Sequence, residues 1–208
     1  MGTQTKGVTL QQKWIWYHLA GSFLGVVLAI AFDSVLEWLK VPPSQVAVGM
    51  GMGVAIGLMQ WAVLRRYGIH QIWIWVTVAG FTVAYVLFEL LGAPLWAWGN
   101  GYALIIATMA GALFTGWLQY RFILKVIPGA SVRWMWVYTL GWLLAHVAAS
   151  ISGPLMRSHI PRALILTLNI SLILSAGPIL GWVTGRYLLP LLRDRPVLDE
   201  SSTEGDLI

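Results

Sequence analysis

The chain contains no cysteine and few charged residues. None of its 208 residues is Cys, and only 10% are Asp, Glu, Lys or Arg. The first absence excludes disulfides, thiolate metal ligands and cysteine nucleophiles. The second leaves too few polar side chains to cover a water-facing surface, because a soluble domain carries about 25% charged residues.

Sequence motifs of common enzyme classes are also missing. The chain has no His-Glu-x-x-His, no Gly-x-Ser-x-Gly and no carboxylates paired at a useful spacing. We therefore predict a protein without enzymatic activity. The net charge of +5 is placed beside apolar segments, which favours a membrane protein and not a nucleic-acid-binding one.

What the chain does have is a high content of apolar residues in long runs. Hydrophobic residues make up 58% of the sequence, and the mean hydropathy is +0.75. Helices of about 20 apolar residues are long enough to cross a bilayer. The sequence predicts an all-α integral membrane protein, with Pro178 as a kink inside its last helix. The six predicted transmembrane helices span 14–32, 46–64, 72–91, 102–124, 134–151 and 163–192.

Two motifs recur three times along the chain. Each odd-numbered helix begins with Trp-x-Trp followed by Gly, and each even-numbered helix carries two small residues and a polar one at fixed spacing. The first motif occurs at Trp14, Trp16 and Gly21, at Trp73, Trp75 and Gly80, and at Trp134, Trp136 and Gly141. The second occurs at Gly53, Gly57 and Gln60, at Ala112, Gly116 and Gln119, and at Gly177, Gly181 and Thr184.

These copies predict three tandem helical hairpins, with repeats over about 13–67, 71–124 and 132–190. A pseudo-threefold six-helix bundle is the closed arrangement of such hairpins, and an open row is the alternative. The membrane domain spans 13–192 in this interpretation, after a short N-terminal cytoplasmic segment over 1–12. The cytoplasmic tail over 193–208 is acidic and has few apolar residues, which predicts disorder.

Basic residues are distributed unevenly between the two ends of the predicted helices. Ten lie at the end that carries both termini, and three lie at the opposite end. Cytoplasmic loops are enriched in Lys and Arg, so we expect both termini in the cytoplasm and the protein in a bacterial cytoplasmic membrane. The paired tryptophans then lie at the cytoplasmic interface, where indoles settle. The ten are Lys6, Lys13, Arg65, Arg66, Arg121, Lys125, Arg133, Arg186, Arg193 and Arg195, and the three are Lys40, Arg157 and Arg162.

Three polar residues occupy equivalent positions in the even-numbered helices: Gln60, Gln119 and Thr184. A polar side chain inside a membrane helix must find a hydrogen-bond partner. One hypothesis is that the three converge on the pseudo-threefold axis and form a ligand or transport site. The alternative is that each only bonds a neighbouring helix, which contributes about 0.6–2 kcal/mol.

Two histidines and one glutamate are further candidates. His18 and His146 lie within predicted helices, where an imidazole can ligate the metal of a haem or pigment or can bond a neighbouring helix. Glu89 is the carboxylate within an apolar helix, close to its end. Intramembrane ionisable residues are functional candidates, but the interpretation we favour for Glu89 is an interfacial ion pair with one of the facing basic residues, Arg157, His159 or Arg162.

Three tandem hairpins are similar in outline to the mitochondrial carriers. The chain lacks their Pro-x-acidic-x-x-basic signature, so this resemblance implies no shared function. The Gly-x-x-Gln-Trp and Trp-x-Trp pattern resembles that of Gly/Trp-rich bacterial multi-pass proteins, which implies no activity.

The sequence favours an embedded subunit or scaffold of a membrane complex. Small residues at four-residue spacing let helix backbones approach closely in lipid, and such faces suit a membrane-protein partner or a second copy. The first alternative is a small transporter or channel with its site near Gln60, Gln119 and Thr184. The second is a haem- or pigment-binding protein through His18 or His146.

Overall fold

The structure is a computed structural model, and it describes residues 9–40, 44–95, 100–150 and 162–193. These residues are all-helical and form six α-helices, joined in two places by short 3₁₀ turns. The prediction of six helices is therefore confirmed. The helices are α1 (Leu10–Trp38), α2 (Gln45–Leu64), α3 (Ile72–Leu95), α4 (Asn100–Phe122), α5 (Arg133–Ser150) and α7 (Arg162–Leu192), and the 3₁₀ turns are Arg65–Tyr67 and Leu124–Val126.

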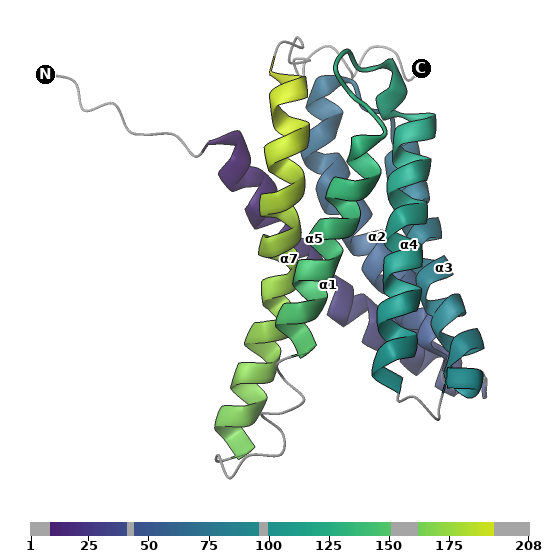
Figure 1. The fold of residues 1–208 in the computed structure, drawn as a ribbon. Helices are drawn as coiled ribbons and strands as arrows, with labels where there is room; N and C mark the ends of the chain where they lie inside the picture. Colours follow the sequence, from purple (N-terminus) through teal and green to yellow (C-terminus); the bar gives the residue numbers. More distant parts are fainter. Residues whose placement is uncertain (1–8, 41–43, 96–99, 151–161, 194–208) are drawn as a thin grey trace, which may run out of the picture.

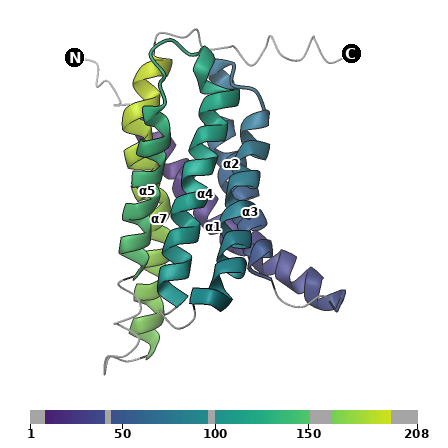
Figure 2. The same cartoon turned by 45° about the vertical axis from the view of Figure 1, so that its right-hand side comes forward.

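The six helices stand side by side in the order of the chain (Figures 1 and 2). Each helix packs on the helix before it and the helix after it, and α7 packs on α1. The row is therefore closed. In Figure 1, α1 begins and α7 ends toward the upper end of the molecule, and this end is called the terminal end below.

Two predicted helix ends were wrong. The first helix does not stop at residue 32 but continues to Trp38, through Asp33 and Glu37. The turns after residue 32 are largely exposed, so the charged side chains of Asp33 and Glu37 can stay in the helix without being buried. The Ser34 hydroxyl donates a hydrogen bond to the Ile30 carbonyl of the same helix. The third helix likewise continues through Gly92 and Pro94 to Leu95. The first helix also begins earlier than predicted, because the Thr9 side chain caps it.

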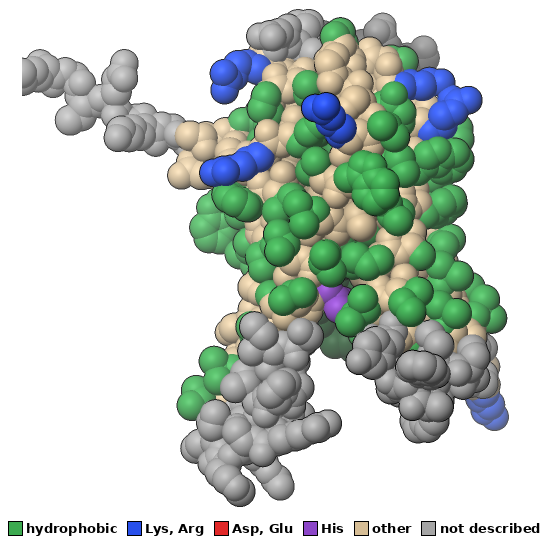
Figure 3. All heavy atoms as spheres, in the orientation of Figure 1, with side chains coloured by type: hydrophobic (Ala, Val, Ile, Leu, Met, Phe, Trp, Pro, Cys, Tyr) green, Lys and Arg blue, Asp and Glu red, His purple; other side chains and the backbone are tan. Residues whose placement is uncertain are grey.

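Four helices are long and apolar enough to cross a membrane, counted over the described residues: Leu10–Trp38, Gln45–Tyr67, Ile72–Leu91 and Ala103–Phe122. Their outward faces carry large apolar side chains, among them Phe23 and Ile30 of α1 and Leu90 of α3. Figure 3 shows this apolar belt and the basic side chains gathered toward the terminal end, above it.

The glycine faces pack against the chain's own helices. A Cβ on Gly51 of α2 would lie 2.6 Å from the Ala29 nitrogen of α1, and one on Gly53 would lie 2.8 Å from the Val78 Cα of α3. A Cβ on Gly177 of α7 would lie 2.6 Å from the His18 carbonyl oxygen. An added Cβ would be too close to these backbone atoms, so glycine at these positions allows the neighbouring helices to pack at this distance.

Candidate functional site

A layer of buried polar side chains crosses the bundle near the terminal end. Three tryptophan indoles donate hydrogen bonds to the three polar residues that the repeat singled out. Trp73 Nε1 donates to Gln60 Oε1 at 2.8 Å, Trp134 Nε1 donates to Gln119 Oε1 at 3.0 Å, and Trp14 Nε1 donates to Thr184 Oγ1 at 3.1 Å. All six side chains are at most 1% exposed. We call these six residues, with His18, Thr77 and Tyr138, the polar layer.

The Gln60 amide also faces His18, and the pattern of partners defines the imidazole tautomer. His18 Nδ1 lies 2.9 Å from the Trp14 carbonyl oxygen, which can only accept, so Nδ1 carries the proton. Gln60 Oε1 already accepts from Trp73, so its Nε2 is the group that lies 2.9 Å from His18 Nε2 and donates to it. A second proton on His18 would place two donors face to face. Both ring nitrogens of His18 are therefore engaged.

The second repeat has the same connections with a different residue in place of the histidine. Gln119 Nε2 donates to Thr77 Oγ1 at 3.1 Å, and Thr77 Oγ1 donates to the Trp73 carbonyl at 2.8 Å. In the third repeat the equivalent pair is Tyr138 and Thr184. The Thr184 hydroxyl donates to the Leu180 carbonyl of its own helix, and the buried Tyr138 hydroxyl has no hydrogen-bond partner of good geometry among the described residues.

Gln60, Gln119 and Thr184 are thus each bonded to neighbouring helices. Among the described residues no hydrogen bond joins any of the three to another. Each instead connects its own helix, α2, α4 or α7, to the tryptophan of the next helix around the ring, and for Thr184 that next helix is α1. The polar layer therefore links neighbouring helices at five of the six junctions of the ring, all except the junction between α5 and α7.

A cavity of about 310 Å³ lies on the side of the polar layer away from the terminal end. Side chains of all six helices line it, and most of them are apolar. Six lining residues lie four positions, or one helical turn, from a member of the polar layer. The polar layer and this first turn therefore close the cavity toward the terminal end. The six are Ser22, Ile56, Phe81, Thr115, Trp142 and Leu180.

The contact between α4 and α5 explains why space remains there. The equivalent of Gly53 and Gly177 is Ala112 on α4, and the equivalent of Gly49 is Thr108. The side chains of Ala112 and Thr108 hold α5 farther from α4 than glycine at these positions would. The contact between α4 and α5 is accordingly the least extensive of the six contacts around the ring, counted over the described residues. Both Thr108 and Ala112 line the cavity.

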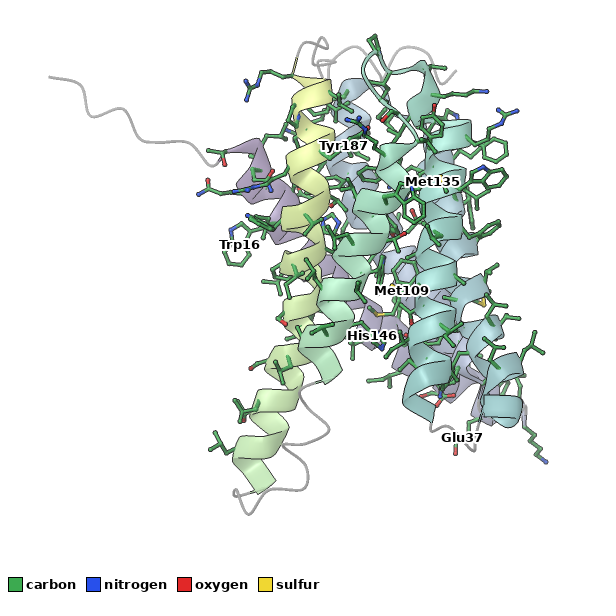
Figure 4. The ribbon with its side chains drawn as sticks, in the orientation of Figure 1. Trp16, Glu37, Met109, Met135, His146 and Tyr187 are labelled. Carbon is green, nitrogen blue, oxygen red and sulfur yellow. The ribbon has the colours of Figure 1, made fainter. Side chains whose placement is uncertain are left out.

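His146 lies in the cavity wall on α5, on the side facing α4 (Figure 4). Tyr85, its equivalent on α3, lines the same cavity. The hydroxyls of Thr108 and Thr115 bond carbonyls of their own helix. The wall is therefore apolar, with an imidazole, a phenol and the Ser22 hydroxyl as its main polar groups.

Glu89 lies apart from the polar layer and caps a helix. Its Oε1 accepts hydrogen bonds from the Ser44 hydroxyl and from the Gln45 amide at the start of α2. A carboxylate at a helix N-terminus is favourable because the unpaired amides there carry partial positive charge. Of the predicted ion-pair partners, Arg157 and His159 lie outside the described residues, and so does the side chain of Arg162.

The interfacial interpretation of the paired tryptophans was wrong for one member of each pair. Trp14, Trp73 and Trp134 are fully buried in the polar layer, whereas Trp16, Trp75 and Trp136 are more than 60% exposed. Residues two apart on a helix point to nearly opposite sides, so the Trp-x-Trp spacing already contained this signal. The cavity-lining residues were also missed, although their spacing of four from the polar residues could have indicated them.

Among the described residues, no group of three or more His, Cys, Asp or Glu side chains could hold a metal ion. Comparison of the chain with protein-family models, with curated proteins and with solved structures finds no match.

Proposed function

We propose that this is a multi-pass membrane protein of a bacterial cytoplasmic membrane. Four described helices have the length and hydropathy of membrane spans, and the outward faces are apolar. Most of the described basic residues lie near the terminal end, so we place it and both termini in the cytoplasm. Arg186 supports this placement, because its guanidinium lies 4.3 Å over the Trp182 ring, an arrangement suited to the interface.

We also propose that the bundle is built from three hairpins related by a pseudo-threefold axis. The repeated connection of the polar layer supports this arrangement, because the same kind of tryptophan bond closes each junction between repeats. The closure of α7 on α1 is what such an axis requires.

Our proposed function is the binding of a small, mainly apolar molecule in the central cavity, without catalysis. The single observation that carries this proposal is a cavity of about 310 Å³ lined by six helices, at the lower end of the range for ligand pockets. Its walls suit a lipophilic molecule with one hydrogen-bonding group, which Tyr85 or His146 would contact. A buried, apolar site of this kind attracts such a molecule from the bilayer by dispersion and shape.

We assign the polar layer a structural role and not a transport role. The amides of Gln60 and Gln119 have their oxygen and nitrogen both engaged in hydrogen bonds. A solute crossing at this level would have to break several buried hydrogen bonds at once.

Photolabelling tests the cavity. A fatty alcohol carrying a diazirine serves as the probe, and adducts are located by peptide mass spectrometry. We expect adducts on cavity-lining segments of α3, α4 and α5. The double variant Ala145→Leu/Ala176→Leu should lose them because it fills the cavity, whereas Ala79→Leu, on the exposed face of α3, should keep them. Adducts confined to outward faces, and equal in both variants, would overturn the proposal.

Two other roles stay predictions of the sequence. A partner subunit would have to dock on the lipid-facing surface, because the glycine faces are occupied within the ring; co-purification from native membranes tests this role. A macrocycle-binding role would rest on His146, because both nitrogens of His18 are engaged. An absorption spectrum of purified protein without a Soret or chlorin band would exclude it.

A further inference from the structure

A second pocket, of about 210 Å³, lies where α1 begins and α2 ends. Its walls include two basic side chains, Lys13 and Arg66, and two phenols, Tyr17 and Tyr67. Leu10 and Val63 add apolar surface beside them. Both basic side chains are exposed, and both tyrosines are partly buried, so the charged groups form the rim and the apolar groups lie deeper.

This set of groups matches the chemistry of a phosphate carried on an apolar body. A lysine ammonium has three N–H donors and an arginine guanidinium has five, and the two phenols can donate as well. Arginine binds phosphate oxygens in bidentate fashion, and lysine supplies a compact charge. The apolar part of the pocket would face the glycerol region or the first methylenes of an acyl chain.

The four groups depart from the internal repeat. The positions equivalent to Lys13 and Tyr17 hold Ile72 and Val76 in the second repeat, and Arg133 and Val137 in the third. The positions equivalent to Arg66 and Tyr67 hold Lys125 and Val126, then Pro190 and Leu191. Neither of the other repeats keeps more than one of the four polar groups. The helix packing common to the repeats therefore does not need them.

We infer that this pocket binds the phosphate headgroup of an anionic phospholipid from the cytoplasmic leaflet. Basic pockets between membrane helices on the cytoplasmic side bind such headgroups, and the terminal end is the end we place in the cytoplasm. The inference rests on that placement in the membrane, and it is independent of what the central cavity holds.

The test measures lipid binding to the purified protein by native mass spectrometry. Phosphatidylglycerol and phosphatidylcholine are the two probes, and glycerol 1-phosphate tests whether a soluble phosphate suffices. We expect a preference for phosphatidylglycerol that falls about tenfold or more in Lys13→Gln/Arg66→Gln. The matched control Lys125→Gln/Arg133→Gln removes the same charge from the same end of the molecule and should keep the preference.

Equal loss in the two double variants would overturn the inference, because it would show attraction by general charge. Full retention in Lys13→Gln/Arg66→Gln would overturn it as well. Binding of glycerol 1-phosphate as tight as that of the lipid would overturn the assignment to a lipid. The variant Tyr17→Phe/Tyr67→Phe keeps all charges and should weaken the preference if the pocket itself is the site. The cavity is tested by photolabelling and the headgroup pocket by lipid binding, so either proposal can fail without affecting the test of the other.

Discussion

The side chain of Gln60 bonds two helices besides its own. Its oxygen accepts from Trp73 of α3, and its nitrogen donates to His18 of α1. Because all three side chains are buried, none of these groups can turn to water if a partner is lost. An uncharged amide suits this position, since it provides one donor and one acceptor on neighbouring atoms.

At this scale we predict that Gln60→Leu destabilises the fold. Leucine fills similar space but leaves the Trp73 N–H and His18 Nε2 without partners, which costs about 1–3 kcal/mol. Reversible unfolding in mixed detergent micelles measures the change. Gln71→Leu, at an exposed position just before α3, is the control and should leave stability nearly unchanged. Equal stability of the two variants would mean that the Gln60 bonds contribute nothing.

At the scale of elements, α2 has the most extensive contacts with its two neighbours, counted over the described residues. Gly51 faces α1, where an added Cβ would lie 2.6 Å from the Ala29 nitrogen and 2.8 Å from its Cα. Gly57 faces α3, where an added Cβ would lie 3.1 Å from the Ile74 Cα. The first contact is with backbone at a distance that cannot be accommodated without moving a helix. The second requires only a small shift.

We therefore predict that Gly51→Ala and Gly57→Ala differ although both place alanine in the same helix. Each gains helix propensity, by about 1 kcal/mol. Gly51→Ala should nevertheless destabilise the protein by about 1–3 kcal/mol, because it forces α1 and α2 apart, whereas Gly57→Ala should lie near neutral. Unfolding of the two variants under identical conditions measures the difference, and the reverse order would contradict the close approach of α1 to α2.

At the scale of the whole molecule, the proposed orientation in the membrane depends on the basic residues at one end of the ring. Arg65, Lys125 and Arg193 are exposed and follow the ends of α2, α4 and α7, which lie at the terminal end. Lys40 is exposed just beyond the other end of α1. A chain that crosses the membrane an even number of times has both termini on the same side. The proposed orientation therefore makes a prediction about which positions a reagent can reach.

The natural absence of cysteine makes this prediction simple to test. In intact cells, an impermeant maleimide should label Lys40→Cys, but it should label Lys125→Cys and Arg193→Cys only after the cells are opened. The unaltered chain, without cysteine, gives the background. Labelling of Lys125→Cys or Arg193→Cys from outside intact cells would overturn the orientation.

The six helices were predictable because apolar run length and the repeat spacing are local properties of the chain. The tryptophans, the two glutamines and Thr184 of the polar layer were likewise found by their repeated positions, although the buried tryptophans were assigned to the membrane interface. Their partners were not predictable, since a bond such as that between Gln60 and His18 joins positions 42 residues apart. The end at residue 32 was missed because charged residues do not stop a helix whose outer turns face outward. The end at residue 91 was missed because the third helix continues through Gly92 and Pro94.

The sequence by itself determined the helical class, the number of helices, the threefold recurrence of the Trp-x-Trp motif and of the motif of two small residues and a polar one, and the concentration of positive charge at one end. Each of these follows from composition and spacing along the chain. Only the tertiary structure decided that the ring closes through α7 and α1, that Trp14 turns inward while Trp16 turns outward, and that a cavity opens beside α4. Those outcomes depend on how closely two helix backbones approach, and that distance is set by pairs of facing residues, such as Ala112 where the other repeats have glycine.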